Sequence, residues 1–151
     1  MADIVSPEKR SRMMAGIQGK NTGPEMIVRR TLFSAGYRYR LYRKDLPGTP
    51  DIVLPRYRCV IFVNGCFWHG HENCRLFRLP KSNTEFWRAK IEGNIARDRK
   101  KYDALAERGW RIIIVWECAV KGAQRLSHAD FQYQLFHAIS EKKKCLVIKG
   151  D

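Results

Sequence analysis

The stretch Cys59-Val-Ile-Phe-Val63 is the clearest indication of the fold. Five consecutive apolar residues are typical of a strand that is buried on both faces of a sheet. A second run of this kind, Ile112-Ile-Ile-Val115, lies within the segment from Trp110 to Trp116. Between the two runs, apolar residues recur at helical spacing from about Thr84 to Arg108. Two buried strands joined by a long helix predict an α/β layer structure.

The flanking segments extend this pattern. Thr22-Gly-Pro-Glu25 is a capping-box sequence, which predicts a helix that ends near Ser34. The residues from Tyr37 to Tyr42 alternate between aromatic and basic, as expected of a strand with one solvated face. Asp51 to Leu54 predicts a short strand after a Pro-Gly turn. The remaining predicted elements are a helix from Ser6 to about Gly16, a helix from about Ala129 to Glu141, and an edge strand over Cys145–Ile148.

Length and composition predict a single domain over residues 1–151. The chain has 151 residues, which suits one domain. Its content of 44% hydrophobic and 29% charged residues is close to the globular average and excludes a disordered chain. No apolar run approaches the roughly 18 residues of a membrane span, and the first residues lack the apolar core of a signal peptide. We therefore expect a cytoplasmic protein without membrane contact.

The net charge indicates a polyanionic partner. Lys plus Arg is 29 and Asp plus Glu is 15, which gives a net charge of +14. An excess of this size favours nucleic acid as the partner. A membrane surface is less favoured, because the basic residues do not gather on one amphipathic helix. Between Glu8 and Lys44 there are ten basic and two acidic residues, so we expect this segment, with Arg10 and Arg12, to contact phosphates.

A cluster of cysteine and histidine residues predicts a structural metal site. Cys66, His69, His71 and Cys74 lie within nine residues, and Cys118 follows the second buried strand. Tetrahedral zinc is held by sets of four such ligands. Three ligands from the loop and one from the strand end would attach the loop to the sheet, and a set of free thiols is the alternative. Spacing alone does not decide which histidine binds the metal.

The other two cysteines are expected to be structural. Disulfides are not expected in a chain without an export signal, and five cysteines cannot all pair. Cys59 and Cys145 lie in apolar runs and are expected to be small core residues.

Two carboxylates are candidates for a catalytic Mg²⁺ site. Asp51 directly follows the turn Pro47-Gly-Thr-Pro50, at the mouth of a predicted strand. This position suits a metal ligand or a turn cap. Glu25 fits its capping role, which leaves one oxygen for a second task. The histidine that zinc does not use, His69 or His71, is a candidate general base.

Two aromatic residues, Phe67 and Trp68, lie within the polar Cys/His loop. They are expected either to be buried against the protein or to be presented as a wedge. Such wedges stack on bases or insert between base steps in nucleic-acid-binding proteins. The residues themselves leave both interpretations open.

Taken together, several motifs resemble the very short patch repair endonucleases, the Vsr family. The resemblance extends over about residues 1–127. The motifs are K-R-S-R-M-M (9–14), T-G-P-E (22–25), P-G-T-P-D (47–51), Y-R-C-V-I-F-V-N-G-C-F-W-H-G-H-E-N-C (57–74), T-E-F-W (84–87), R-D-R (97–99) and G-W-R-I-I-I-V-W-E-C (109–118).

The resemblance implies a restriction-endonuclease-like fold, in which helices flank a central mixed sheet that carries a structural zinc loop. It implies a bacterial DNA repair enzyme of the nucleoid that recognises the T:G mismatch left when 5-methylcytosine deaminates in a methyltransferase target site. Such an enzyme nicks double-stranded DNA 5′ to the mismatched T and uses Mg²⁺. It also implies a monomer, with a MutL-type mismatch-repair protein as a further partner.

The resemblance assigns catalytic roles by motif. Asp51 resembles the principal Mg²⁺ ligand, and the backbone carbonyl of Val63 a further one. Glu25 resembles a supporting carboxylate near the metal waters, and His69 resembles the general base.

The resemblance also assigns the binding residues. The implied zinc ligands are Cys66, His71, Cys74 and Cys118. The implied DNA contacts are the wedge of Phe67, Trp68 and Trp87, together with Met14, Arg10 and Arg12 in an N-terminal helix or arm over residues 1–20.

Two other functions stay open as alternatives. A sequence-specific restriction endonuclease usually carries an acid-x-Lys motif on its second strand, whereas that strand here reads Cys59-Val-Ile-Phe-Val63. A non-catalytic zinc module that binds DNA is the other alternative. Asp98 is expected either to orient His69 or to form a surface ion pair with Arg97 or Arg99. Asn64 stands where some members of the family carry histidine.

Overall fold

The computed structural model describes residues 21–151, and its centre is a five-stranded sheet in the order β1-β2-β3-β4-β5. β1 and β2 are antiparallel, as are β2 and β3, whereas β4 is parallel to both β3 and β5. The expected mixed sheet is therefore confirmed. The strands are β1 (Arg40–Leu41), β2 (Ile52–Leu54), β3 (Cys59–Asn64), β4 (Arg111–Trp116) and β5 (Cys145–Ile148).

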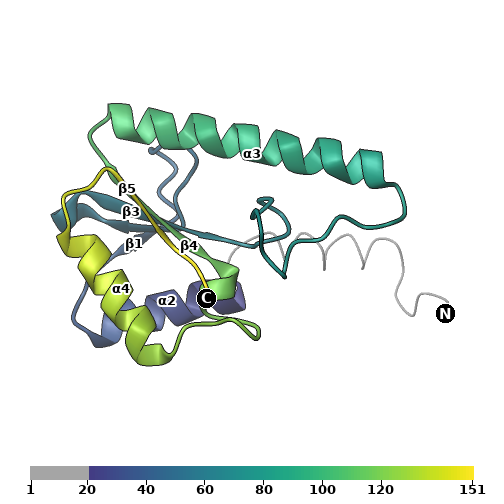
Figure 1. Cartoon of the computed structure of the whole chain (residues 1–151). Helices are drawn as coiled ribbons and strands as arrows, with labels where there is room; N and C mark the ends of the chain where they lie inside the picture. Colours follow the sequence, from purple (N-terminus) through teal and green to yellow (C-terminus); the bar gives the residue numbers. More distant parts are fainter. Residues whose placement is uncertain (1–20) are drawn as a thin grey trace.

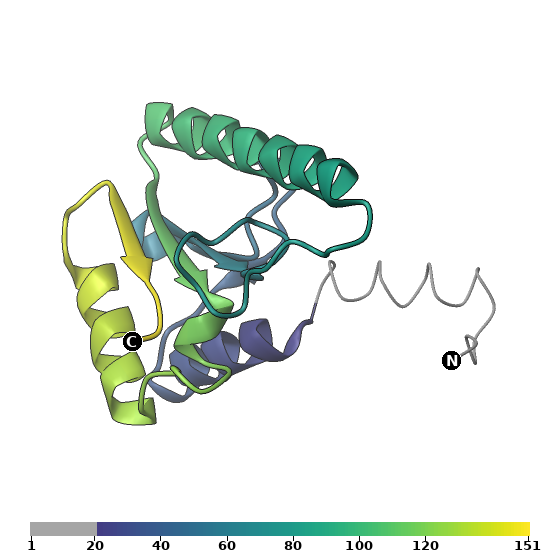
Figure 2. The same ribbon diagram turned by 45° about the vertical axis from the view of Figure 1, so that its right-hand side comes forward.

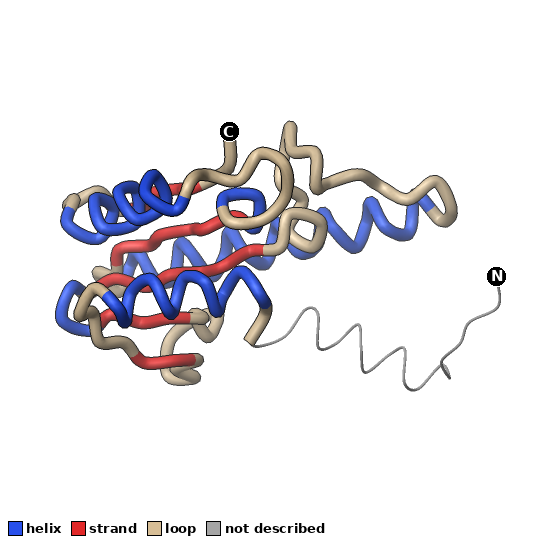
Figure 3. The backbone as a smooth tube through the Cα atoms, turned by 90° about the horizontal axis from the view of Figure 1, so that it is seen from below, coloured by secondary structure: helices blue, strands red, loops and turns tan. Residues whose placement is uncertain are grey.

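Helices cover both faces of the sheet. They are α2 (Gly23–Ser34), α3 (Thr84–Glu107) and α4 (His128–Ser140), with short 3-10 turns η1 (Pro55–Tyr57) and η2 (Glu117–Ala119). α3 lies over one face, and α2 and α4 lie on the other (Figures 1 and 2). Seen from the side of α2 and α4, the strands separate these two helices from α3 (Figure 3). Within residues 21–151 no helix has the length and apolar character needed to cross a membrane.

The two buried strands supply a core to each layer of helices. In β3, Cys59 and Ile61 pack with residues of α2 and α4, whereas Val60 and Phe62 pack on the side of α3. Successive side chains of a strand point to opposite faces. A central strand that is covered on both faces therefore has to be apolar at every position, which explains the continuous run.

Two expectations about these elements are wrong. Of the predicted strand from Tyr37 to Tyr42, only Arg40–Leu41 pairs with the sheet, and Tyr42 has a φ of 50° that ends the extended backbone. Cys145 is exposed rather than a core residue. Its strand, β5, is at the edge of the sheet as predicted, so it is covered less completely than β3 or β4.

The predicted helix from Ser6 to Gly16 lies outside the described residues, as do Arg10, Arg12 and Met14. Their assignment to DNA contacts stays a prediction, and so does the arm over residues 1–20.

The segments that carry the candidate residues meet at one end of the sheet. In the parallel pair of β3 and β4, Asn64 is opposite Trp116, so the loops that follow these strands begin side by side. β2 runs antiparallel to β3, with Ile52 opposite Ile61. Asp51, which precedes β2, therefore lies beside the end of β3.

Candidate active site and metal centre

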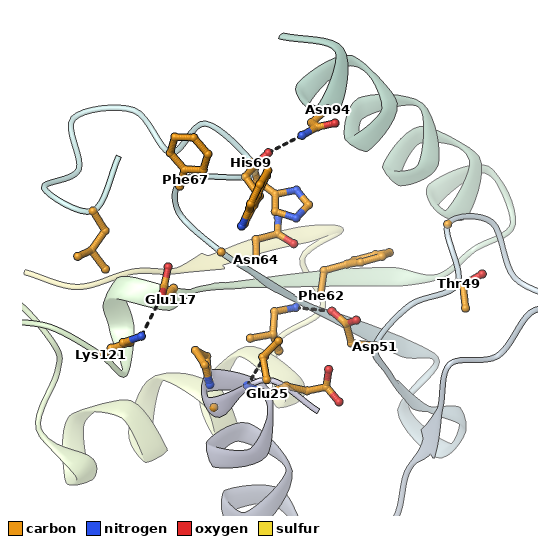
Figure 4. A pocket seen from close by; sticks show the side chains of 18 of the residues that line it. Glu25, Thr49, Asp51, Phe62, Asn64, Phe67, His69, Asn94, Glu117 and Lys121 are labelled. Carbon is orange, nitrogen blue, oxygen red and sulfur yellow. Dashed lines mark hydrogen bonds and ion pairs between the residues drawn. The ribbon is translucent and has the colours of Figure 1, made fainter. Parts of the chain in front are cut away.

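A cleft of about 990 Å³ opens at this end of the sheet. Its walls come from the start of α2, the turn before β2, the end of β3, the loop that follows β3, and the inner face of α3 (Figure 4). The cleft brings together predicted site residues that are far apart in the sequence: Glu25, Asp51, Val63, Phe67, Trp68 and His69.

Asp51 is fixed by the backbone of β3. The Val63 N–H donates a hydrogen bond of 2.8 Å to Asp51 Oδ2 (Figure 4). Burial raises the pKa of Asp51 to about 6, against the lowering effect of this hydrogen bond. Glu25 adds to the increase in pKa through its own negative charge. A buried carboxylate near a second one has a strong electrostatic reason to bind a cation.

Glu25 lies in the first turn of α2 and lines the cleft, and its supporting role at a metal ion stays a prediction. The Thr22 hydroxyl accepts a hydrogen bond of 3.3 Å from the Glu25 N–H, which confirms that Thr22 caps α2. The Glu25 side chain is 2% exposed and lines the cleft. Its carboxylate accepts hydrogen bonds from the Tyr42 hydroxyl and, at 3.3 Å, from Arg29. Burial, with this hydrogen bond, raises the pKa of Tyr42 to about 12, so Tyr42 remains a donor.

His69 is paired with Asp98. The distance from His69 Nδ1 to Asp98 Oδ2 is 2.6 Å, and Lys101 Nζ is 3.0 Å from the other oxygen, Asp98 Oδ1. Burial raises the pKa of Asp98, but the contacts with His69 and Lys101 outweigh it, and the net pKa is lowered. Of the two roles that the sequence left open for Asp98, the contact with His69 is the one found. With Nδ1 engaged, His69 has Nε2 left for chemistry in the cleft.

The Cys/His cluster is a separate site beside the cleft. The ligand atoms of Cys66, His71, Cys74 and Cys118 all lie within 4.8 Å of one another. His71 Nδ1 is 3.5 Å from Cys66 Sγ and 3.6 Å from Cys118 Sγ. Tetrahedral zinc with bonds of about 2.3 Å to sulfur and 2.05 Å to nitrogen places these atoms about 3.6 Å apart. The four residues thus fit a zinc ion.

The surroundings of the cluster orient its ligands. The His71 ring stacks on Trp116, with ring centroids 4.0 Å apart. The Cys66 N–H donates to Glu117 Oε1 at 3.1 Å, and the Gly150 N–H donates to Cys118 Sγ at 3.3 Å. Burial lowers the pKa of His71, which keeps the imidazole neutral as a metal ligand requires.

The predicted wedge residues form an aromatic cluster outside both cores. The ring centroid of Phe67 is 5.0 Å from that of Trp68 and 5.6 Å from that of Trp87. All three side chains are half-buried, and the neighbouring Phe86 is 62% exposed. They are therefore neither core residues nor free side chains, and their role as a wedge stays a prediction.

Two further polar residues of the cleft, Asn64 and Lys101, have no role assigned from the sequence. Asn64 is 2% exposed and donates a hydrogen bond of 2.9 Å to the Tyr102 hydroxyl. Lys101 lines the cleft from α3. Asn64 belongs to the quoted motif over residues 57–74, whereas Lys101 belongs to no quoted motif and reaches the cleft through the packing of α3.

Comparison with known proteins gives consistent results. A family model described as DNA mismatch endonuclease Vsr matches residues 2–75. The chain is similar to the DNA mismatch endonuclease Vsr of Escherichia coli, with 45% identity over 127 residues, 84% of this chain and 81% of that protein. It is also similar to the type II nicking enzyme V.XorIIP of Xanthomonas oryzae pv. oryzae, with 58% identity over 118 residues, 78% of this chain and 86% of that protein.

Proposed function

The chain belongs to the Vsr family of DNA mismatch endonucleases, and from this premise we propose that it nicks duplex DNA 5′ to the T of a T:G mismatch in a Mg²⁺-dependent reaction. The observation that carries the proposal is the pairing of His69 with Asp98 in the cleft that also holds Asp51 and Glu25. A candidate base and two candidate metal carboxylates thus face the same space.

The donor set of the cleft fits Mg²⁺, which prefers oxygen ligands and uses few protein carboxylates. Asp51 would hold the ion together with the Val63 carbonyl, and Glu25 would support its water ligands. When bound, the ion supplies positive charge near the scissile phosphate. The zinc assignment is separate: Cys66, His71, Cys74 and Cys118 would hold a structural zinc ion.

The residues of the chain would then act in sequence. The aromatic cluster of Phe67, Trp68 and Trp87 enters beside the mismatch, where unstacking a base costs less than in paired DNA. Asp98 holds Nδ1 of His69, so Nε2 takes the proton from the attacking water. Arg10, Arg12 and Met14 would add DNA contacts from the N-terminal arm. A MutL-type partner and a site of action on the bacterial chromosome complete the proposal.

Nicking of a T:G duplex with and without Mg²⁺ tests this function. We expect a single-strand nick 5′ to the mismatched T only with Mg²⁺ and much more slowly on a C:G control. Asp51→Ala should lower the rate by about 10³, because metal charge stabilisation is worth several kcal/mol. It should keep zinc and T:G affinity. An intact T:G duplex after incubation with Mg²⁺ would refute the proposal. Equal cleavage of the C:G duplex would indicate a restriction-type enzyme instead.

A further inference from the structure

The cleft contains a positively charged group that none of the assigned roles uses. Among the described residues, two lysines line it. Lys121 is 65% exposed and pairs with Glu117 at 3.6 Å, as surface lysines commonly do. Lys101 is different, because its side chain is only 21% exposed and it projects from the inner face of α3.

Lys101 is held on three sides. Its Nζ lies 3.0 Å from Asp98 Oδ1 and 4.5 Å from the centre of the Phe62 ring. Its stem packs against the turn before Asp51: a Cβ added to Gly48 would lie only 2.5 Å from Lys101 Cδ and 2.7 Å from its Cβ. Gly48 is therefore needed both for its φ of 74° and for the passage of the lysine. Such packing fixes the position of the ammonium before any ligand arrives.

The position of the ammonium matches the needs of an anionic substrate. Glu25 and Asp51 line the same cleft and repel a phosphate group. An ammonium has three N–H donors, and the contact with Asp98 uses one of them. Lysine binds phosphate as a point charge, without the fixed geometry that arginine requires. Asp98 contacts Lys101 and His69 through its two oxygens, so the cation lies close to the candidate base.

We propose that Lys101 contacts the phosphate at which the DNA strand is cut. Its ammonium donates a hydrogen bond to a non-bridging oxygen and stabilises the negative charge that develops there as water attacks. Lys101 keeps its proton throughout. The proposal rests on the proposed function, since it needs a scissile phosphate in this cleft. Restriction endonucleases usually carry a lysine in an acid-x-Lys motif, which β3 lacks, and Lys101 supplies a cation to the cleft from α3 instead.

A methylphosphonate in place of the scissile phosphate tests this contact directly, because it removes the charge of one phosphate only. Binding is measured on T:G duplexes with either group, with Ca²⁺ replacing Mg²⁺ so that the native duplex stays intact. Lys101→Met should weaken binding of the native duplex about tenfold and leave binding of the methylphosphonate duplex unchanged. Lys100→Met is the matched control, since Lys100 is the exposed neighbour on α3. It should affect both duplexes equally.

The same variants are then compared in single-turnover nicking with Mg²⁺. Lys101→Met should slow nicking on the order of 10²-fold, as loss of one donor to a developing oxyanion does, and Lys101→Arg should recover part of the rate. Circular dichroism and zinc content check that the fold is intact. If the wild-type protein nicks T:G DNA but Lys101→Met affects both duplexes equally or neither, the inference is wrong and Lys101 serves only the ion pair. If the wild-type protein does not nick, the proposed function fails and the inference fails with it.

Discussion

His69 and His71 are separated by one residue, yet they belong to different sites. His69 pairs with the Asp98 carboxylate and lines the cleft, whereas His71 lies among three cysteines and stacks on Trp116. Gly70, between them, has a φ of 60°. A Cβ at Gly70 would lie 2.7 Å from side-chain atoms of Ile91 and Ile95, so only glycine fits this turn against α3.

The difference teaches that neighbouring groups, rather than the histidine itself, decide its role. A carboxylate that holds Nδ1 orients the ring and leaves Nε2 for proton transfer. Thiols at 3.5 and 3.6 Å, with burial that lowers the pKa of His71, favour a neutral imidazole as a metal ligand. The same loop thus places one histidine in the cleft and the other in the Cys/His cluster.

The largest effect should come from removing a zinc ligand. Cys66→Ser or Cys118→Ser should abolish stoichiometric binding of zinc. The free energy of unfolding should then fall by about 4 kcal/mol, which corresponds to a decrease in Tm of roughly 10 °C. Elemental analysis measures the zinc content, and calorimetry measures Tm. Cys145→Ser is the control, because Cys145 is exposed and lies outside the cluster. The Cys59→Ser protein should also retain zinc, since Cys59 is not part of the cluster. A purified wild-type protein without zinc would contradict the assignment.

Alanine at each histidine should separate the two sites. His69→Ala should slow nicking by about 10²-fold or more, as expected for loss of a general base, and should keep its zinc. His71→Ala should lose zinc and stability together. Single-turnover rates and metal content, measured on both variants, decide the matter. If His69→Ala is the variant that loses zinc, the roles of the two histidines are reversed.

A smaller effect is expected at the aromatic cluster. Trp68→Ala should weaken binding of T:G DNA about tenfold, since stacking on a base is worth roughly 1–3 kcal/mol, and should change binding of paired DNA much less. Competition binding on the two duplexes measures this. Phe33→Ala, at an aromatic residue that is 58% exposed on α2, should change neither affinity. Equal losses on both duplexes for Trp68→Ala would make Trp68 a packing residue of the zinc loop.

The smallest effect concerns the partner of His69 and depends on pH. The folded-state pKa of Asp98 lies below its ordinary value of 3.8, so its ion pairs stabilise the protein above about pH 4, and this contribution is lost as pH falls through the lowered pKa. Asp98→Asn should therefore lower the free energy of unfolding by about 1 kcal/mol at pH 6. In urea unfolding, the free energies of unfolding of the wild-type and Asp98→Asn proteins should become equal as the pH approaches 3. A difference that is constant with pH would contradict this.

The sequence predicted the features that depend on local pattern. β3 and β4 follow from runs of apolar residues. Three of the four metal-site residues stand in the loop after β3, and the fourth, Cys118, closely follows β4. The choice of His71 over His69 as the metal ligand needed the family resemblance, because the spacing of the loop residues allows either histidine to reach the metal.

Features that depend on packing between distant segments were not predictable. Lys101 reaches the cleft only because α3 packs at a particular register against β3, and no local pattern encodes that register. The same packing decides between the two roles that the sequence left open for Asp98. Cys145 lies in an apolar run, but its exposure depends on whether the edge of the sheet is covered. The positive φ of Tyr42 is unusual for a bulky residue and is fixed by its contacts rather than by its own preference.

The length of α3 has a mechanical consequence. Its 24 residues span about 36 Å, whereas the six residues of β3 span about 20 Å, so the helix overhangs the sheet (Figure 1). Leu105 anchors one end in the core, and Trp87 lies near the overhanging end. In mechanical terms α3 is a beam that is fixed at Leu105 and supported nearer Trp87 by the loop after β3, where Asn94 donates a hydrogen bond of 2.8 Å to the Trp68 carbonyl. Trp87 and Lys101 lie about 21 Å apart along this one continuous helix, so a single element joins the aromatic cluster to the cleft.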